Sequence, residues 1–215
     1  MLGVIPALIQ DDPEFSELPP LVLIHDGGGT TINYYYLEDV QRHVWGISNE
    51  LLVDETAWPG EMARIAAKDF DISVLGVIMM DTYCPFADDI GHDRDTSGIE
   101  WGEATTEESK ETTLKSIANS AKFSQQWSRE SRISLSETKL PPAVLLRARD
   151  SHGASDAEFR GGKNILGWEN CRSDFFSHIF DVPGNHYTLF ADDNIECLSE
   201  ELTRACEILE DERDD

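Results

Sequence analysis

A run of three glycines is the first stretch whose residue types and spacing could support chemistry. Gly27–Gly29 follows the apolar run Leu21–Ile24 and the polar pair His25-Asp26. Because glycine has no Cβ, such a loop can turn sharply and point backbone N–H groups at an anionic oxygen, either a phosphate or the oxyanion of an acyl-transfer intermediate. Neither G-x-x-x-x-G-K-[ST] nor G-x-G-x-x-G occurs here, so the phosphate alternative fits poorly. A tight turn without a ligand is an equally good interpretation of this stretch alone.

An aspartate and a histidine complete the set of candidate groups. Asp81 directly follows the apolar run Val74–Met80, and His186 stands in the turn Pro183-Gly184-Asn185-His186. A strand-end aspartate followed later by a loop histidine matches the order of acid and base in a nucleophile triad built on an α/β sheet. Alone, Asp81 is more often a helix cap and His186 a surface residue. Their combination and order favour a catalytic pair.

Short apolar runs alternate with helical segments along the chain, which predicts an α/β fold with a mainly parallel sheet and flanking helices. In such sheets ligands gather beyond the carboxyl ends of the strands, so the glycine loop, Asp81 and His186 are expected to share one cleft. The predicted strands are Val4–Ile9, Leu21–Ile24 (buried on both faces), Arg42–Ile47, Val74–Met80, Ala143–Leu146 and Phe176–Phe180. Helices are predicted to begin at Tyr34 and to cover Glu61–Lys68 and Cys197–Leu209, and Asp150–Gly162 is predicted to be a polar loop.

The middle of the chain, residues 86–140, differs from the rest in being polar and acidic. Helical patches are predicted at Glu107–Ala121 and Phe123–Arg129. This segment is expected to be a mobile insertion over a core rather than part of it. A chain of 215 residues is long enough for one sizeable core, so a single domain over residues 1–215 is predicted.

The charge balance excludes several classes of partner. Asp and Glu number 42 against 17 Lys and Arg, which gives a formal net charge of −25. Such a charge repels nucleic acid and anionic membrane surfaces. The four cysteines form no C-x-x-C and no zinc spacing, so neither a metal nor a cofactor is predicted. No secretory leader and no run of about 18 apolar residues occurs, which predicts a soluble, cytoplasmic protein without a membrane span.

Six blocks of this sequence together resemble the thioesterase domain of fungal non-ribosomal peptide and polyketide synthetases, which has an α/β-hydrolase fold. The blocks are Leu21–Thr30, Val44–Asn49, Ile72–Asp81, Pro142–Ala148, Gly167-Trp168 and Asp181–Phe190. They cover most of the chain outside residues 86–140, which by resemblance form the lid over the acyl chain. The resemblance also implies that Asp81 is the triad acid, that His186 is the triad base, and that the Gly27 and Gly28 backbone forms half of the oxyanion hole.

The chain departs from this family at the nucleophile. The family carries a G-x-S-x-G elbow between the strands that end near Ile47 and at Asp81, and this chain has none. Roughly thirty residues are expected to be absent, with the central strand, the serine and the second oxyanion donor among them. The strands on either side must then pair with each other, or the fold is compromised, because buried unpaired ladder groups are costly.

Two other side chains are possible substitutes for the missing serine nucleophile. Gly46-Ile47-Ser48-Asn49-Glu50 is the string nearest to the elbow, but its last position is wrong and it matches an earlier strand of the family. Cys84 lies close behind Asp81, and a thiolate beside His186 is conceivable. The favoured interpretation of Cys84 is a buried thiol at the root of the lid.

Three functions stay open at this point. The resemblance implies a hydrolase of secondary metabolism that acts on acyl or peptidyl thioesters, free or on a carrier protein, and that is impaired because the serine nucleophile is absent. A second is an enzyme in which His186 and Asp81 act as a general base without a covalent intermediate, in a cyclisation or proton transfer. A third is a non-catalytic binding remnant. Replacing His186 separates the second from the third.

Overall fold

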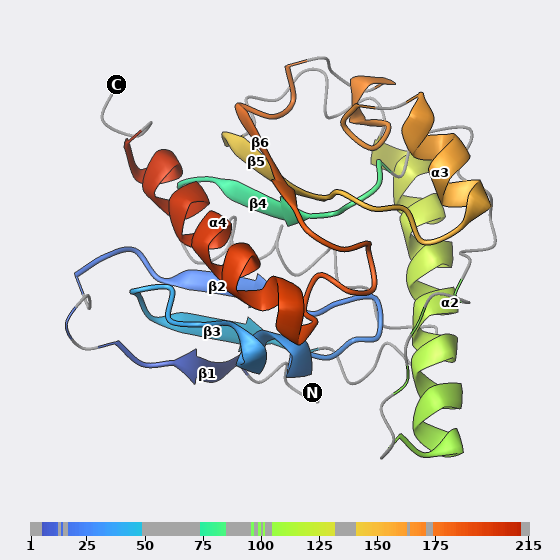
Figure 1. Ribbon diagram of the computed structural model, residues 1–215, viewed down its shortest axis with the longest axis horizontal. Coiled ribbons are helices and arrows are strands. Elements are labelled where there is room, and N and C mark those ends of the chain that lie inside the picture. Colours follow the sequence, from blue (N-terminus) through green and yellow to red (C-terminus); the bar gives the residue numbers. More distant parts are fainter. Residues whose placement is uncertain are drawn as a thin grey trace. The chain divides into compact units, whose positions relative to one another are not determined.

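The computed structural model describes residues 6–12, 14, 17–48, 74–84, 96, 99, 101, 105–131, 141–162, 164–170 and 174–211. These residues fall into two compact units (Figure 1). Unit 1 comprises the described residues of Met1–Ser73 and Glu100–Phe123, and unit 2 those of Val74–Ile99 and Ser124–Asp215. The single domain expected over residues 1–215 stays a prediction.

Unit 1 contains a three-stranded sheet in the order β1-β3-β2. β2 (Leu21–Ile24) pairs with β3 (Val44–Ile47) in parallel, whereas β1 (Pro6–Gln10) pairs with β3 antiparallel. The helix expected from Tyr34 is a 3₁₀ helix, η2 (Ile32–Tyr36). The three strands agree with the predicted apolar runs to within a few residues.

The sheet of unit 1 is covered on one face only. Leu23 and Val44 lie on the covered face and are 4% and 0% exposed. On the other face Val22 and Ile24 are 49% and 44% exposed. The prediction that Leu21–Ile24 is buried on both faces is therefore wrong. Because successive side chains of a strand point to opposite faces, an unbroken apolar run cannot reveal that one of the two faces lacks cover.

Unit 2 contains a second three-stranded sheet in the order β4-β5-β6, and both of its pairings are parallel. β5 (Ala143–Ala148) lies in the middle, between β4 (Val77–Met80) and β6 (His178–Val182). Five of the six residues of β5 are buried. The apolar run Ala143–Leu146 at its start is typical of a strand in the centre of a parallel sheet, where both faces are covered. This sheet brings the carboxyl ends of its three strands to one edge.

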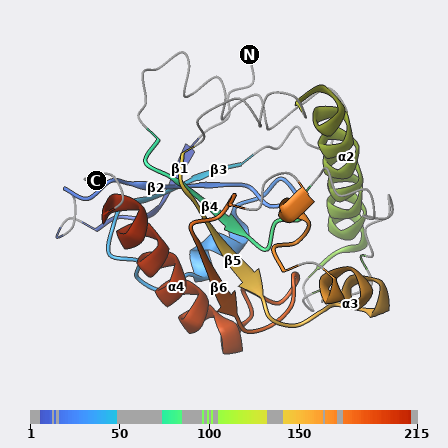
Figure 2. The same ribbon diagram turned by 90° about the horizontal axis from the view of Figure 1, so that it is seen from above.

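The last helix covers this sheet. α4 (Asp192–Asp211) packs along β5 and β6, as Figure 2 shows, and also contacts β4. Its buried positions recur at helical spacing, as the sequence predicts: Leu198, Leu202, Ala205, Cys206 and Leu209. Gly76 allows the chain before β4 to pack closely against the C-terminal end of α4, because a Cβ on Gly76 would lie 2.5 Å from a methyl carbon of Leu209.

The remaining elements differ in part from expectation. α2 (Glu107–Ser131) is one continuous helix of 25 residues, where two helical patches were expected. Asp150–Gly162 is not only a loop, since it contains the helix α3 (Ala154–Gly161). The helix predicted at Glu61–Lys68 lies outside the described residues, and so does the segment in which the central strand was expected to be missing. In the described part of the chain, no helix is long and apolar enough to cross a lipid bilayer.

Candidate active site

Asp81 is held at the carboxyl end of β4 by the neighbouring strand. Its backbone N–H donates a hydrogen bond to the Leu146 carbonyl at 2.7 Å, which continues the parallel ladder. The residue then turns into the left-handed region with φ of 43°, uncommon for a non-glycine residue. This turn directs the carboxylate toward β5, where Asp81 Oδ1 accepts a hydrogen bond from Ala148 N at 2.8 Å. The side chain is fully buried.

His186 is held in a tight turn after β6. Asn185 N donates to Thr188 Oγ1 at 2.8 Å, and Tyr187 N donates to Asn185 Oδ1 at 2.9 Å. Gly184 begins the turn with φ of 85°, a conformation that favours glycine. The turn is fixed to the rest of the unit because Asp150 N donates to the Gly184 carbonyl at 2.9 Å. The backbone on both sides of the imidazole is therefore constrained.

Gly184→Ala is expected to destabilise the protein by at least about 1–2 kcal/mol, because an alanine is strained at this φ. The added Cβ would also lie 2.5 Å from Asn194 Nδ2 and 2.8 Å from Thr188 Oγ1. Gly161→Ala is the matched control, since a Cβ there meets no atom within 4 Å. At this helical position alanine is expected to be neutral or to stabilise by up to about 1 kcal/mol. Urea unfolding measures both, and equal effects of the two changes would contradict the role given to Gly184.

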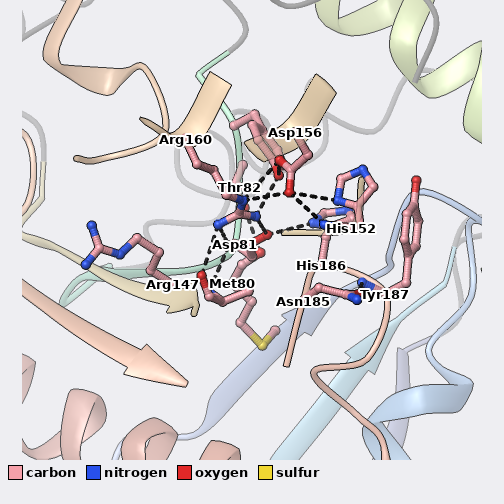
Figure 3. A network of polar contacts seen from close by, with 12 residues as sticks. Met80, Asp81, Thr82, Arg147, His152, Asp156, Arg160, Asn185, His186 and Tyr187 are labelled. Carbon is pink, nitrogen blue, oxygen red and sulfur yellow. Dashed lines mark hydrogen bonds and ion pairs between the residues drawn. The ribbon is translucent and has the colours of Figure 1, made fainter. Parts of the chain in front are cut away.

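The two predicted side chains meet in unit 2 (Figure 3). His186 Nδ1 lies 3.0 Å from Asp81 Oδ2. An ionised carboxylate can only accept, so Nδ1 carries the proton and donates a hydrogen bond to Asp81. In the neutral ring, Nε2 is then the unprotonated nitrogen and can act as a base. The His186 side chain is 31% exposed, so the imidazole is accessible while its carboxylate partner is not.

Arg160 of α3 also binds the Asp81 carboxylate. Its Nη2 donates to Oδ2 at 2.6 Å and its Nη1 to Oδ1 at 3.2 Å, a two-pronged contact that matches the planar guanidinium to the carboxylate. Burial raises the pKa of Asp81, but hydrogen bonds from His186 and Arg160, together with their charges, outweigh it and hold the pKa below its usual value. Asp81 is therefore an anion at neutral pH.

A second carboxylate lies on the other side of Arg160. Arg160 Nε donates to Asp156 Oδ2 at 2.8 Å and to its Oδ1 at 3.0 Å. Tyr83 donates its hydroxyl proton to Asp156 Oδ1 at 2.6 Å and accepts a hydrogen bond from Arg160 Nη2 at 2.6 Å. His152 N donates to Asp156 Oδ2 at 3.0 Å, and His152 Nδ1 is 3.1 Å from the same oxygen. One guanidinium is thus shared by two buried carboxylates.

Aromatic rings line the approach to His186. The ring centroids of Tyr187, Tyr83 and His152 lie 5.1, 5.6 and 6.1 Å from that of His186. The His186 contacts with Tyr187 and Tyr83 are edge-on, an arrangement that aromatic pairs prefer. The rings therefore limit rotation of the imidazole away from its hydrogen bond with Asp81.

The glycine loop belongs to unit 1, and its own aspartate occupies part of it. Gly28 N donates to Asp26 Oδ1 at 2.8 Å, and Thr30 N donates to the same oxygen at 3.2 Å. Gly29 N donates to the Asp26 carbonyl at 3.0 Å. The loop does bind an anionic oxygen, but that oxygen comes from the chain itself. The roles of Gly27 and Gly28 in an oxyanion hole, and a cleft shared with Asp81 and His186, stay predictions.

The two alternative nucleophiles have the surroundings of structural side chains. Cys84 is fully buried in an apolar cluster with Leu145, Leu166 and Trp168. Ser48 Oγ lies 3.0 Å from the hydroxyl of Thr31 in unit 1. Among the described residues no group of three or more His, Cys, Asp or Glu side chains could hold a metal ion.

Arg160 and Asp156 are not among the site residues predicted from the sequence. A signal for them exists, because an aspartate and an arginine four residues apart are neighbours on a helix surface. That signal loses its value once the segment Asp150–Gly162 is interpreted as a loop.

The chain is similar in sequence to several proteins that are named thioesterases. No family model matches the sequence. The chain is 27% identical to thioesterase frbD of Dothideomycetidae sp. (strain 11243), covering 89% of this chain and 90% of that protein. It is 29% identical to thioesterase AMT4 of Alternaria alternata, covering 89% and 85%. The frbD alignment extends over 236 residues, more than this chain has, so the relative carries residues without a counterpart here.

Solved structures show the same fold at lower sequence identity. The thioesterase domain of Vlm2 has a TM-score of 0.57 and 18% identity, and the alignment covers 94% of this chain and 97% of that one. The NocB thioesterase domain from the nocardicin cluster, in a covalent complex with a fluorophosphonate nocardicin G analogue, has a TM-score of 0.60 and 13% identity, with coverage of 94% and 99%. YbtT, a type II thioesterase, has a TM-score of 0.60 and 12% identity, with coverage of 95% and 98%. The fold is that of the α/β-hydrolase-type thioesterase domains.

Proposed function

We propose that this chain hydrolyses acyl or peptidyl thioesters of secondary metabolism by general-base catalysis. The proposal is supported by its sequence similarity to fungal thioesterases and by its α/β-hydrolase fold. The observation that carries the proposal is the hydrogen bond between His186 Nδ1 and the buried Asp81 carboxylate. That bond leaves Nε2 as the basic nitrogen of a partly exposed ring. A buried, ionised carboxylate stabilises the imidazolium that forms when the ring takes a proton.

In the proposed reaction, the carbon–sulfur bond of the thioester is replaced by a carbon–oxygen bond. One proton passes from water to the leaving thiolate through His186. His186 Nε2 takes a proton from water while the water oxygen bonds to the thioester carbonyl carbon. The carbon–sulfur bond then breaks, and the thiolate takes the proton back from the imidazolium. Water replaces serine as the nucleophile because the sequence has no G-x-S-x-G elbow. A general base alone gives about 10²–10⁴-fold acceleration, so turnover is slow beside that of an intact triad.

The names of the relatives support the proposed substrate class. frbD and AMT4 are named thioesterases, and a structure of the related-fold Vlm2 domain is described as bound with a dodecadepsipeptide. We infer an acyl or peptidyl thioester for this chain, presented on a carrier protein or as a free thioester. The net charge of −25 disfavours an approach by an acidic carrier surface, which would need a basic patch to bind.

Active-site labelling separates the water mechanism from the covalent one. The full chain is incubated with an alkyl fluorophosphonate and analysed by intact mass and peptide mapping. We expect no stoichiometric label, while the release of thiol from acyl-N-acetylcysteamine thioesters proceeds slowly above the rate of an equal concentration of imidazole. An intact serine thioesterase treated in parallel is the positive control for labelling.

Two results would overturn this proposal. Stoichiometric labelling of any serine, or of Cys84, would establish a covalent mechanism. Thiol release no faster than with free imidazole, across acyl chains of several lengths, would favour the non-catalytic binding protein. Binding of a non-hydrolysable acyl analogue by calorimetry would then measure that alternative directly.

A further inference from the structure

We propose that Arg160 and Asp156 are positioning residues that set the charge presented to His186: Asp156 neutralises the guanidinium, so that Asp81 keeps one uncompensated negative charge for the imidazolium. The proposal rests on the role of His186 as the base in the proposed function and deepens it. It assigns a purpose to a buried ion cluster that a simple acid–base pair does not need.

Arg160 and His186 bind the same carboxylate, that of Asp81. A guanidinium that binds Asp81 through both Nη atoms, at 2.6 and 3.2 Å, competes with His186 for the same carboxylate. If Arg160 and Asp81 were alone, their charges would cancel, and the dyad would lack the anion that stabilises an imidazolium. Asp156 removes this conflict, because it accepts the Nε proton of the same guanidinium at 2.8 Å.

The formal charges of the three side chains show what His186 faces. Asp81 and Asp156 each contribute −1 and Arg160 contributes +1, so the cluster carries −1 when His186 is neutral and 0 when it is protonated. This is the same net charge as that of a simple Asp–His pair, reached with two extra groups, Asp156 and Arg160. What the cluster adds is rigidity, since Asp81 accepts from Ala148 N, from both Arg160 Nη atoms and from His186 Nδ1.

The groups that face His186 within unit 2 come from several elements. Asp81 follows β4, His152 precedes α3, and Tyr187 is the next residue of the turn (Figure 3). Tyr83 also follows β4, and its ring is edge-on to that of His186. Burial and the nearby charges of Asp81 and Asp156 raise the pKa of Tyr83, so the phenol is neutral. Burial raises the pKa of Asp156, but hydrogen bonds from Tyr83 and His152 and the Arg160 charge outweigh it and lower the pKa.

Two neutral substitutions have opposite expected effects on His186. Asp156→Asn leaves Asp81 and Arg160, with a sum of zero, and is expected to lower the pKa of His186 by about one unit. Arg160→Gln leaves two carboxylates and is expected to raise it by about one unit. The double variant restores −1 and is expected to return the pKa to within a few tenths of the unmodified protein. A merely structural role predicts the opposite of the last result, namely that the double variant is the most perturbed.

The experiment is an NMR titration of the imidazole resonances in the full-length chain, with His186 assigned by comparison with His186→Asn. The matched control is Glu158→Gln, which removes one exposed negative charge from the same helix and is expected to shift the pKa by less than about 0.3 units. Circular dichroism checks the fold of each variant. If Arg160→Gln does not fold, Asp156→Asn and the double variant still decide between the two roles.

Two results would overturn the inference. One is a shift of the same sign in the pKa of His186 in both single variants. The other is a shift in Asp156→Asn that is no larger than the shift in Glu158→Gln. This readout does not depend on turnover, so it can fail while the proposed hydrolysis stands, and it can succeed while no hydrolysis is found. Where turnover is measurable, the acid limb of the plot of kcat/KM against pH is expected to move with the pKa of His186 in each variant.

Discussion

Thioester hydrolysis by this chain is expected to fall by about a hundred- to ten-thousandfold when His186 is replaced by asparagine, because the change removes the basic nitrogen and keeps a hydrogen-bond donor for Asp81. The measurement is the initial rate of thiol release from an acyl thioester at saturating and limiting substrate. His178→Asn is the control, since this exposed histidine lies on β6 and is expected to leave the rate unchanged.

The two kinetic constants separate catalysis from binding. A role as general base predicts a loss in kcat with little change in KM, because the proton transfer occurs only in the transition state. A rate that survives in His186→Asn would remove the basis of the proposed function. A loss that appears only in KM would mean that His186 binds the substrate and does not act on it.

Arg160→Met is expected to destabilise the protein by roughly 3–5 kcal/mol, the range for breaking a buried ion pair by removing one partner. Asp81 is fully buried and the Arg160 side chain is 12% exposed, so the remaining carboxylates have little water to replace the guanidinium. Arg149→Met is the matched control, because Arg149 is exposed and such changes stay within about 0.5 kcal/mol. Urea unfolding at neutral pH measures both.

The sign of the pH dependence provides a second check on Arg160→Met. Asp81 has a pKa below its usual value in the folded protein, so its contribution to stability is present at neutral pH and is lost as the pH falls through the folded pKa. Without Arg160 the pKa of Asp81 rises, because burial then dominates. The difference in unfolding free energy between the two proteins should therefore shrink as the pH falls from the raised pKa of Asp81 in the variant, above its usual value of about 4, to the lowered pKa in the unmodified protein. A difference that stays constant down to pH 3 would mean that the loss comes from packing and not from charge.

The fold was predictable where burial and periodicity agree. β5 and α4 are examples, because the apolar run Ala143–Leu146 and a helix with buried residues at helical spacing each leave a clear pattern. α3 was not predictable in the same way. Its one buried residue is the charged Asp156, and its apolar contact with the core is limited to the partly buried Phe159, so it shows no apolar stripe at helical spacing. A helix that is stabilised by an ion cluster looks like a polar loop in the sequence.

The candidate site was predictable in its simplest part. The strand-end position of Asp81 and the turn around His186 indicated a pair, and the two side chains are in contact. The partners that keep Asp81 ionised come from α3, far from Asp81 in the sequence. The Gly28 N–H also could not be assigned in advance, because its hydrogen bond to Asp26 depends on the local turn and not on residue types.

The hydrogen bond from Gly28 to Asp26 makes the glycine loop selective for charge. An oxygen that takes this N–H must displace a carboxylate that is tethered two residues away. A neutral carbonyl is a weaker acceptor than a carboxylate, so it is expected to leave this turn as it is, whereas a fully charged oxygen is expected to compete for the N–H.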